Sequence, residues 1–398
     1  MSLFGGYYTI TGVTFFLFTL FIITFLGYVL GGFKIKGVSL GTAGVFLVSL
    51  VFGMIFYDDV TATFVEAKKG YEVVQNIGLL LFITSVGFIA GPKFFGGLKK
   101  NATSYVLLGA IIILSGGLAT ALIMVFDKGV NSALATGLLA GALTSTPAFS
   151  AAIDSLATTE LKNACSAGYG ISYIFGVIGV VLFVQLMPKL LKANMDEERA
   201  KLIGVVAGEE KQRRKDFFEI DDFGIFAFAL AVVLGLLVGA IKIPLGKGSF
   251  SLGKTGGPLL VALIMGHFYN VKKVKLMPDV RLLKVFREFG LMLFLIGAGV
   301  PGGAEFLKYM QLNYFIYGAI ITVVPLFTGF LFAKYVLKLP LLNNLGSITG
   351  GMTSTPALGT LISVSETDEV ANAYAATYPM ALVLVVVVTQ VLILLFPV

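Results

Sequence analysis

The chain has 398 residues, of which 57% are hydrophobic and 13% are charged, and its mean hydropathy is +0.94. This composition excludes the two or three soluble domains that length alone would suggest. The net charge of +7 does not indicate nucleic-acid binding, because membrane proteins gather basic residues in cytoplasmic loops. A single cysteine, Cys165, and a single histidine, His267, exclude an intramolecular disulfide and a histidine cluster for a metal. We therefore expect no cofactor, no metal and no nucleic-acid partner.

Long stretches without any charged residue indicate helices that cross a bilayer. Several of these stretches exceed the roughly 20 residues that a crossing requires. A transmembrane β-barrel is excluded, because its strands would alternate apolar and polar residues over about ten positions. No cleavable signal peptide is expected at the N-terminus, which has neither a basic start nor a cleavage site. In chain order, the predicted helical segments lie near 11–31, 38–56, 76–95, 103–126, 132–157, 163–188, 222–243, 254–269, 287–305, 313–337, 340–364 and 371–396.

The two halves of the chain repeat one another. Residues 137–169 align without a gap on residues 346–378, and 14 of these 33 positions are identical. The match includes the pentapeptide TSTPA and the pairs Tyr169/Tyr378 and Asn163/Asn372. A fixed-period match of this kind indicates duplicated structural units. We therefore divide the chain into membrane repeat 1 (1–189), a charged cytoplasmic linker (190–221) and membrane repeat 2 (222–398).

Basic residues give the relative orientation of the two copies, because cytoplasmic loops are enriched in lysine and arginine. If each TSTPA segment enters and leaves on one side, each copy has five crossings, the copies are inverted, and 21 of the 29 basic residues are cytoplasmic. If every segment spans, the copies are parallel and 19 are cytoplasmic. The sequence favours inverted copies with a re-entrant hairpin and leaves the spanning alternative open.

The TSTPA motif is the predicted functional site. Proline interrupts a helix but suits its first turn, and a preceding serine or threonine can cap the new helix. Two broken segments at corresponding positions of two halves indicate a transporter's binding site, where the positive helix ends attract anions. The candidate residues are Thr144, Ser145, Thr146 and Pro147 in the first half, and Thr353, Ser354, Thr355 and Pro356 in the second. The alternative is a proline kink whose hydroxyls satisfy the local backbone.

Further candidates follow each motif. Tyr169, Tyr173 and Tyr378 carry phenols that need partners inside a membrane, either within the protein or on a substrate. Asn163 and Asn372 are candidate substrate contacts, with helix capping as the alternative that we favour. Asp154 has Ser363 as its counterpart, which argues against an acidic proton relay shared by both halves.

These residues resemble the aspartate:alanine exchanger family of bacterial membrane proteins. The resemblance rests on GALTSTPAFSAA with GYGISYIFGVIGVVLF, GGMTSTPALG with AYAATYPMALVLVVVVTQ, and GLLLFITSVGFIAGPKFF. It implies a two-repeat secondary transporter of the inner membrane that exchanges or exports amino acids or dicarboxylates. Many members carry soluble regulatory domains where this chain has its charged linker, and the first half has Tyr173-Ile174 in place of the family's Tyr-Pro.

We therefore expect an all-helical transporter, not an enzyme, with a small anionic or zwitterionic substrate, alternating access and a homodimeric assembly. The alternative is a sodium- or proton-coupled cation antiporter, which would need ionisable residues inside the membrane. The two TSTPA breaks should lie within about 15 Å of each other. In an elevator-type movement, a block of 76–95, 132–188, 287–305 and 340–396 would move against a scaffold of 11–56, 103–126, 222–269 and 313–337.

Overall fold

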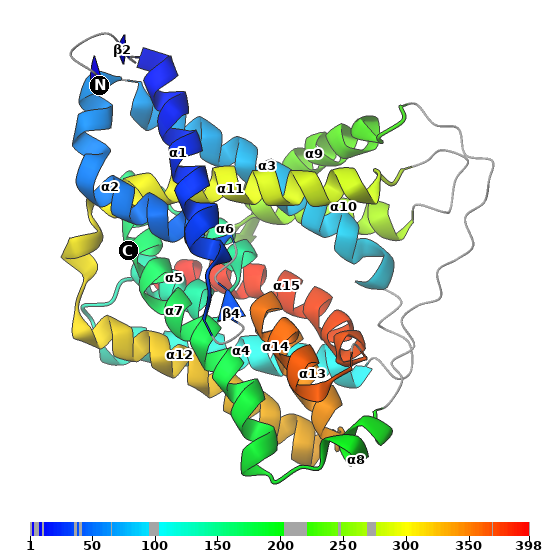
Figure 1. Cartoon of the computed structure of the whole chain (residues 1–398). Helices are drawn as coiled ribbons and strands as arrows, with labels where there is room; N and C mark the ends of the chain where they lie inside the picture. The colour runs from blue at the N-terminus through cyan, green and yellow to red at the C-terminus, as the bar shows by residue number, and fades with distance from the viewer. Residues whose placement is uncertain are drawn as a thin grey trace.

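The computed structural model describes residues 2–3, 8–9, 12–35, 38–39, 42–64, 66–94, 103–202, 221–245, 248–268, 276–367 and 369–397. Within these ranges the chain is almost entirely helical (Figure 1). Seven of the described helices are long and apolar enough to cross a membrane, in agreement with the composition. The helices are α1 (Gly12–Gly32), α2 (Ala43–Thr63), α3 (Ala67–Phe94), α4 (Thr103–Phe126), α5 (Ser132–Ala142), α6 (Thr146–Ser155), α7 (Thr159–Leu190), α8 (Met195–Ala200), α9 (Ile225–Gly239), α10 (Gly253–His267), α11 (Val280–Ala304), η3 (Phe306–Tyr309), α12 (Leu312–Leu331), η4 (Phe332–Val336), α13 (Leu341–Gly351), α14 (Thr355–Ser365) and α15 (Val370–Leu395).

Short antiparallel ladders are an addition to the all-helical expectation. Each consists of two strands of two or three residues in the connections between helices. They are β1 (Ser2–Leu3) with β2 (Tyr8–Thr9), β3 (Lys34–Ile35) with β4 (Val38–Ser39), and β5 (Ile243–Leu245) with β6 (Gly248–Phe250).

One group of helices is built around α3 and α11, which pack against each other. Glycines bring these two backbones together: a Cβ atom at Gly290 would lie 2.6 Å from the amide nitrogen of Phe82. α2 packs along α11 and α10 along α3, and α1 and α9 cover the outside of α2 and α10. We call these six helices the α3–α11 group. They occupy the upper part of Figure 1.

The second group contains both TSTPA segments. α4 packs on α12 and α15, and α7 packs on α12 and α5. The repeat is visible in these contacts, because a Cβ at Gly109 of α4 would lie 3.1 Å from Thr377 of α15, and one at Gly318 of α12 would lie 2.9 Å from Ser172 of α7. We call α4 to α7 and α12 to α15 the hairpin group, which lies below the other group in Figure 1.

This grouping corrects our expected division into block and scaffold. We had placed 76–95 and 287–305 with the hairpins, and 103–126 and 313–337 with the scaffold. In the structure α3 and α11 pack with α2 and α10, whereas α4 and α12 pack with α7 and α15. The physical reason is the close glycine approach of α2 to α11 and of α3 to α10, at Gly53 and Gly87, which apolar content alone does not reveal.

Candidate functional site

Each TSTPA motif forms the turn between two short helices, and its residues end the first helix and begin the second. In the first half Thr144 has φ of 50°, a left-handed conformation that ends α5. The amides of Thr144 and Ser145 donate to Gly141 O and Ala140 O at 2.9 and 2.8 Å. These two bonds are the Schellman arrangement, in which glycine usually occupies the left-handed position. A threonine there is strained, and such strain persists only where the surroundings hold it.

The second half repeats this turn. Thr353 has φ of 52°, and Thr353 N and Ser354 N donate to Gly350 O and Thr349 O at 3.1 and 2.9 Å. Ser145 and Ser354 are the N-cap residues of α6 and α14, and proline lies in the first turn of both helices. The predicted helix starts at Thr146–Pro147 and Thr355–Pro356 are therefore confirmed. The Thr355 side chain lies outside the part of the chain that the structure describes.

The two turns are in direct contact. The Thr144 hydroxyl donates to Met352 O at 3.0 Å, and the Thr353 hydroxyl donates to Leu143 O at 3.0 Å. The expected proximity of the two breaks is thereby confirmed. This exchange explains why threonine replaces glycine at the left-handed position, because glycine has no hydroxyl to reach the other half. In this structure both hydroxyls bind backbone rather than remaining available to a ligand.

In the first half, α5, the turn and α6 form a hairpin beside α7, which we call hairpin 1. α5 runs parallel to α7: a Cβ at Gly137 would overlap Cys165 O, one at Gly141 would lie 2.5 Å from Tyr169 O, and one at Gly176 would lie 2.5 Å from Gly141 O. The turn therefore lies beside the middle of α7. Only three residues separate the end of α6 from the start of α7, so α6 must run back toward the start of α7.

In the second half α13, the turn and α14 form the equivalent hairpin 2 beside α15. A Cβ at Gly346 would lie 2.5 Å from Val370 O, and one at Gly350 would lie 2.6 Å from Tyr374 O, so α13 runs parallel to the start of α15. The end of α14 contacts α8, which follows α7, whereas the end of α6 lies near Gln390 in the last third of α15. The two hairpins thus approach from opposite sides, and their tips meet.

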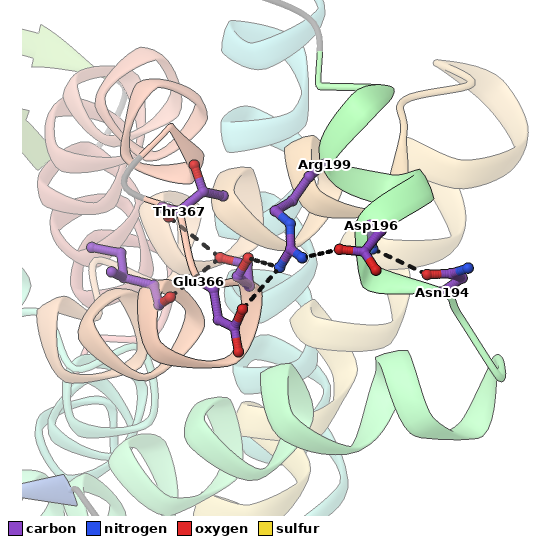
Figure 2. Close-up of polar contacts among 7 residues, drawn as sticks. Asn194, Asp196, Arg199, Glu366 and Thr367 are labelled. Atoms are coloured by element: carbon purple, nitrogen blue, oxygen red, sulfur yellow. Dashed lines mark hydrogen bonds and ion pairs between the residues drawn. The ribbon is translucent and has the colours of Figure 1, made fainter.

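Helix α8 contacts both ends of hairpin 2, and Figure 2 shows the contacts of Arg199 near the end of α14. Arg199 donates to Ser365 O at 3.0 Å, at the last residue of α14, and also pairs with Glu366 and Asp196. Glu198 accepts from the amide of Leu341 at 3.3 Å, at the first residue of α13. The basic side chain therefore binds a helix C-terminus and the acidic one a helix N-terminus, as the helix dipoles favour.

Aromatic rings surround the first tip. Tyr169 is fully buried, stacks on Phe149 with centroids 4.2 Å apart, and lies next to Tyr173. Its phenol is close to the Thr146 hydroxyl. In the second half Tyr378 stacks on Tyr374 at 5.3 Å and is half-buried. Tyr169 therefore lies beside the tip of hairpin 1, and Tyr378 occupies the equivalent position on α15.

The preference for capping at Asn163 and Asn372 was wrong. α7 begins at Thr159 with Thr158 as its N-cap, so Asn163 lies inside the helix, where it donates to Glu305 at 3.2 Å. α15 begins at Val370, and the exposed Asn372 lies in its first turn. Both asparagines lie at the hairpin bases, away from the tips. Their predicted role as substrate contacts stays a prediction.

Two features of the second half were not found from sequence. The Ser354 hydroxyl is fully buried and has no hydrogen-bond partner among the side chains and backbone that the structure describes, whereas the Ser145 hydroxyl accepts from Ala148 N at 3.3 Å. Arg287 of α11 lies close enough to Tyr378 for an electrostatic interaction and pairs with Glu288 at 2.6 Å. We had counted Arg287 only as a cytoplasmic charge. Its position on α11 just before a long apolar run, beyond the charged residues of the first turns, is the signal that could have identified it.

A groove of about 530 Å³ lies elsewhere, between α4 and α12. Its lining is mostly apolar and includes Leu118, Leu122 and Ile320, with Asp127 and Tyr317 at one end. No residue of either TSTPA motif lines it. The Tyr317 hydroxyl, which donates to Asp127 at 2.8 Å, lowers the pKa of that carboxyl below its usual value. The groove is therefore separate from the candidate site.

Comparison with known proteins agrees with these features. The sequence model of a family described as "Predicted Permease Membrane Region", the aspartate:alanine exchanger family, matches residues 19–189 and 227–394. An uncharacterized transporter of Bacteroides fragilis is 26% identical, over 94% of this chain and 97% of that protein. One of Desulfotalea psychrophila is 25% identical, over 95% and 96%. These alignments extend over 533 and 539 positions, more than the 398 residues of this chain, so both relatives contain residues without a counterpart here.

Proposed function

Because the chain belongs to the aspartate:alanine exchanger family, we propose that this membrane transporter exchanges or exports small carboxylates across the bacterial inner membrane. The observation that carries the proposal is the contact between the two hairpin tips through Thr144 and Thr353. It brings the N-terminal ends of α6 and α14 to one place, where the positive dipole ends and the first-turn amides favour an anion. No charged side chain lies within either TSTPA motif, so the anion would be bound by these amides and by hydroxyls.

Substrate class is proposed from the nearby groups. The unpaired Ser354 hydroxyl is available to donate to a carboxylate at the start of α14. Arg287 is the cationic side chain that we assign to a second carboxylate, which favours an acidic amino acid or a four-carbon dicarboxylate over a neutral amino acid. Its pairing with Glu288 provides a partner when no substrate is bound. Guanidinium groups bind carboxylates in two-point geometry, which makes arginine suited to this task.

The proposed architecture is two inverted copies, each with five crossings and one re-entrant hairpin. The opposite approach of hairpins 1 and 2 and the parallel packing of α5 on α7 support it. Transporters with inverted repeats move one unit against another around a central site. We propose that the hairpin group carries the substrate and moves against the α3–α11 group, and that the protein acts as a homodimer.

Counterflow in proteoliposomes tests the function. Vesicles loaded with unlabelled aspartate, alanine or succinate should accumulate the labelled compound when the purified protein is present. Thr146→Val and Thr355→Val should each reduce uptake at subsaturating substrate about tenfold or more, because a buried carboxylate that loses a hydrogen bond is destabilised by about 1–3 kcal/mol. Thr120→Val is the matched control, since Thr120 is a buried threonine of α4 that binds Gly116 O.

The proposal fails if no carboxylate in the panel drives counterflow, or if both motif variants transport as the control does. The cation antiporter is tested in the same vesicles with a sodium or proton gradient and a pH-sensitive dye. A gradient that dissipates only when the protein is present, with no carboxylate exchange, would favour that alternative.

A further inference from the structure

Around the base of hairpin 1, polar side chains connect the hairpin group to the start of α10 and to the segment at the end of α11, which continues into η3. The interaction of Arg287 with Tyr378 also crosses between the two groups, at a separate place. The elements that contribute to the contacts at the base of hairpin 1 are the end of α6, the start of α7, the end of α15, the start of α10 and the end of α11. The contacts are Asp154 with Lys254 and Thr255, Gln390 with Leu252, Asn163 with Glu305, and Glu160 with Lys308. At the base of hairpin 2, Arg199 and Glu198 of α8 bind both ends of that hairpin, so their contacts do not cross to the α3–α11 group.

The contact of Asp154 is the most specific of the four. Its carboxylate accepts from the amides of Lys254 and Thr255 at 2.5 and 3.3 Å, at the start of α10. The N-cap of α10 is Leu252, which has no side-chain oxygen, so Asp154 supplies the missing cap from another part of the chain. Gly253 has φ of 63°, and a Cβ atom there would overlap the Asp154 carboxylate.

The remaining contacts surround this one. Gln390, which is 6% exposed, donates to Leu252 O at 3.2 Å, immediately before the helix that Asp154 caps. Asn163, which is 7% exposed, donates to Glu305 at the end of α11. Glu160 and Lys308 form an exposed ion pair at 3.3 Å. Neighbouring charges that face Asp154 are Lys254 and Lys162.

The repeat shows that this cluster is not a general property of the hairpins. The counterpart of Asp154 is Ser363, which binds Gly359 O within its own helix. The exit of hairpin 1 is therefore tied to the other helix group, whereas the exit of hairpin 2 is tied to α8. Any movement between the two groups must break the first connection and can preserve the second.

We propose that Asp154, Gln390, Asn163 and Glu160, with their partners at Leu252 to Thr255, Glu305 and Lys308, form a latch that holds the base of hairpin 1 closed. The inference rests on the proposed alternating access, in which the base of hairpin 1 is closed in one end state and open in the other. Opening requires the two groups to separate, and water at the membrane surface replaces the lost hydrogen bonds. The exposed pair contributes least, because solvent screens it.

Distance measurement between spin labels tests the latch without a substrate. Ala157→Cys beside hairpin 1 and Ala240→Cys after α9 place one label on each group, both at exposed positions, in a Cys165→Ser background. The full chain in lipid nanodiscs should give one short distance. Asp154→Ala with Gln390→Ala should raise the population of longer distances at least tenfold. Asp127→Asn is the matched control, because Asp127 binds Tyr317 within the hairpin group.

A second variant covers the case in which the first does not fold. Glu160→Lys breaks only the exposed ion pair between Glu160 and Lys308, so this variant should fold. It should lengthen the distance between the spin labels less than Asp154→Ala with Gln390→Ala does. Adding Lys308→Glu should restore the original distribution. Unchanged distances in both Asp154→Ala/Gln390→Ala and Glu160→Lys would overturn the latch. If the variants give longer distances but the protein transports no carboxylate, the latch is supported and the proposed function is contradicted. If counterflow is normal and the distances are unchanged, the proposed function is supported and the latch is contradicted.

Discussion

In the first half of the chain, Phe149 stacks on Tyr169, and Phe46 and Phe294 pack edge-on against these rings. In the second half Leu358 stands in place of Phe149, and Gly359 replaces the buried Ser150. A Cβ atom at Gly359 would meet no other atom within 4 Å. The same backbone turn is thus enclosed by aromatic rings on hairpin 1 and has free space along hairpin 2.

The serine hydroxyls at the two tips also differ: the one on hairpin 1 is engaged within the described structure, and the one on hairpin 2 is not. Ser145 caps its own helix, whereas Ser354 is fully buried and finds no partner within the described part of the chain. A buried unpaired hydroxyl is unfavourable and needs an explanation such as a ligand in another state. Under the proposed function we expect hairpin 1 to have mainly a structural task and hairpin 2 to contribute more to substrate binding.

The largest effect on stability is expected at Gly137, where hairpin 1 packs closely against α7. Gly137→Ala would place a methyl group on the carbonyl oxygen of Cys165, and neither backbone can move away within the packed hairpin. Overpacking of this kind costs about 1–3 kcal/mol or more. We expect a loss of folded protein in size-exclusion chromatography and a lower Tm. Gly346→Ala should be milder, because its nearest atom, Val370 O, would lie 2.5 Å away. Equal Tm values for the wild type and Gly137→Ala would contradict the close packing of α5 on α7.

Removing the reciprocal hydrogen bonds of Thr144 and Thr353 tests whether the two hairpin tips are equivalent in stability. Thr144→Val and Thr353→Val keep the left-handed strain and each leave one carbonyl, Met352 O or Leu143 O, without its donor. Each should lower stability by about 1–3 kcal/mol and by the same amount. Thr144→Gly removes the strain together with the bond, so its Tm should lie between those of wild type and Thr144→Val. A large difference between the two valine variants would show that the tips are not equivalent even in their backbone contact.

Local chemistry explains which parts of this arrangement were predictable. Proline and serine fix where α6 and α14 begin, and the repeat indicated that the two breaks meet. The task of Thr144 was not predictable, because its partner lies 208 residues away. The cap of α7 was missed because the helix extends to Thr159 through the charged residues Glu160 and Lys162, which we had excluded from an apolar segment. The grouping of helices depends on glycine contacts of α2 with α11 and of α3 with α10, which composition does not contain.

The two capping serines should separate stability from binding. Ser145→Ala removes a cap and should lower the free energy of unfolding by about 1 kcal/mol, with little change in half-saturation during counterflow. Ser354→Ala removes no hydrogen bond in this structure, so Tm should stay constant, while half-saturation should rise about fivefold or more if the hydroxyl binds the carboxylate. Thermal unfolding and counterflow are measured on the same preparations. The opposite pattern would assign substrate binding to hairpin 1.

The smallest effect is expected at the open face of hairpin 2. Gly359→Ala adds a methyl group where there is space and improves helix propensity, so it should raise stability by up to about 1 kcal/mol. Gly359→Leu sharpens the comparison, because a larger side chain also fits this structure and should leave Tm unchanged. If hairpin 2 packs against the α3–α11 group in the other end state, as hairpin 1 does here, the leucine would obstruct that packing and slow exchange severalfold without destabilising the protein. A leucine variant that loses stability would show that the space beside α14 is already filled, and one that exchanges at the normal rate would show that hairpin 2 keeps this face free throughout the cycle.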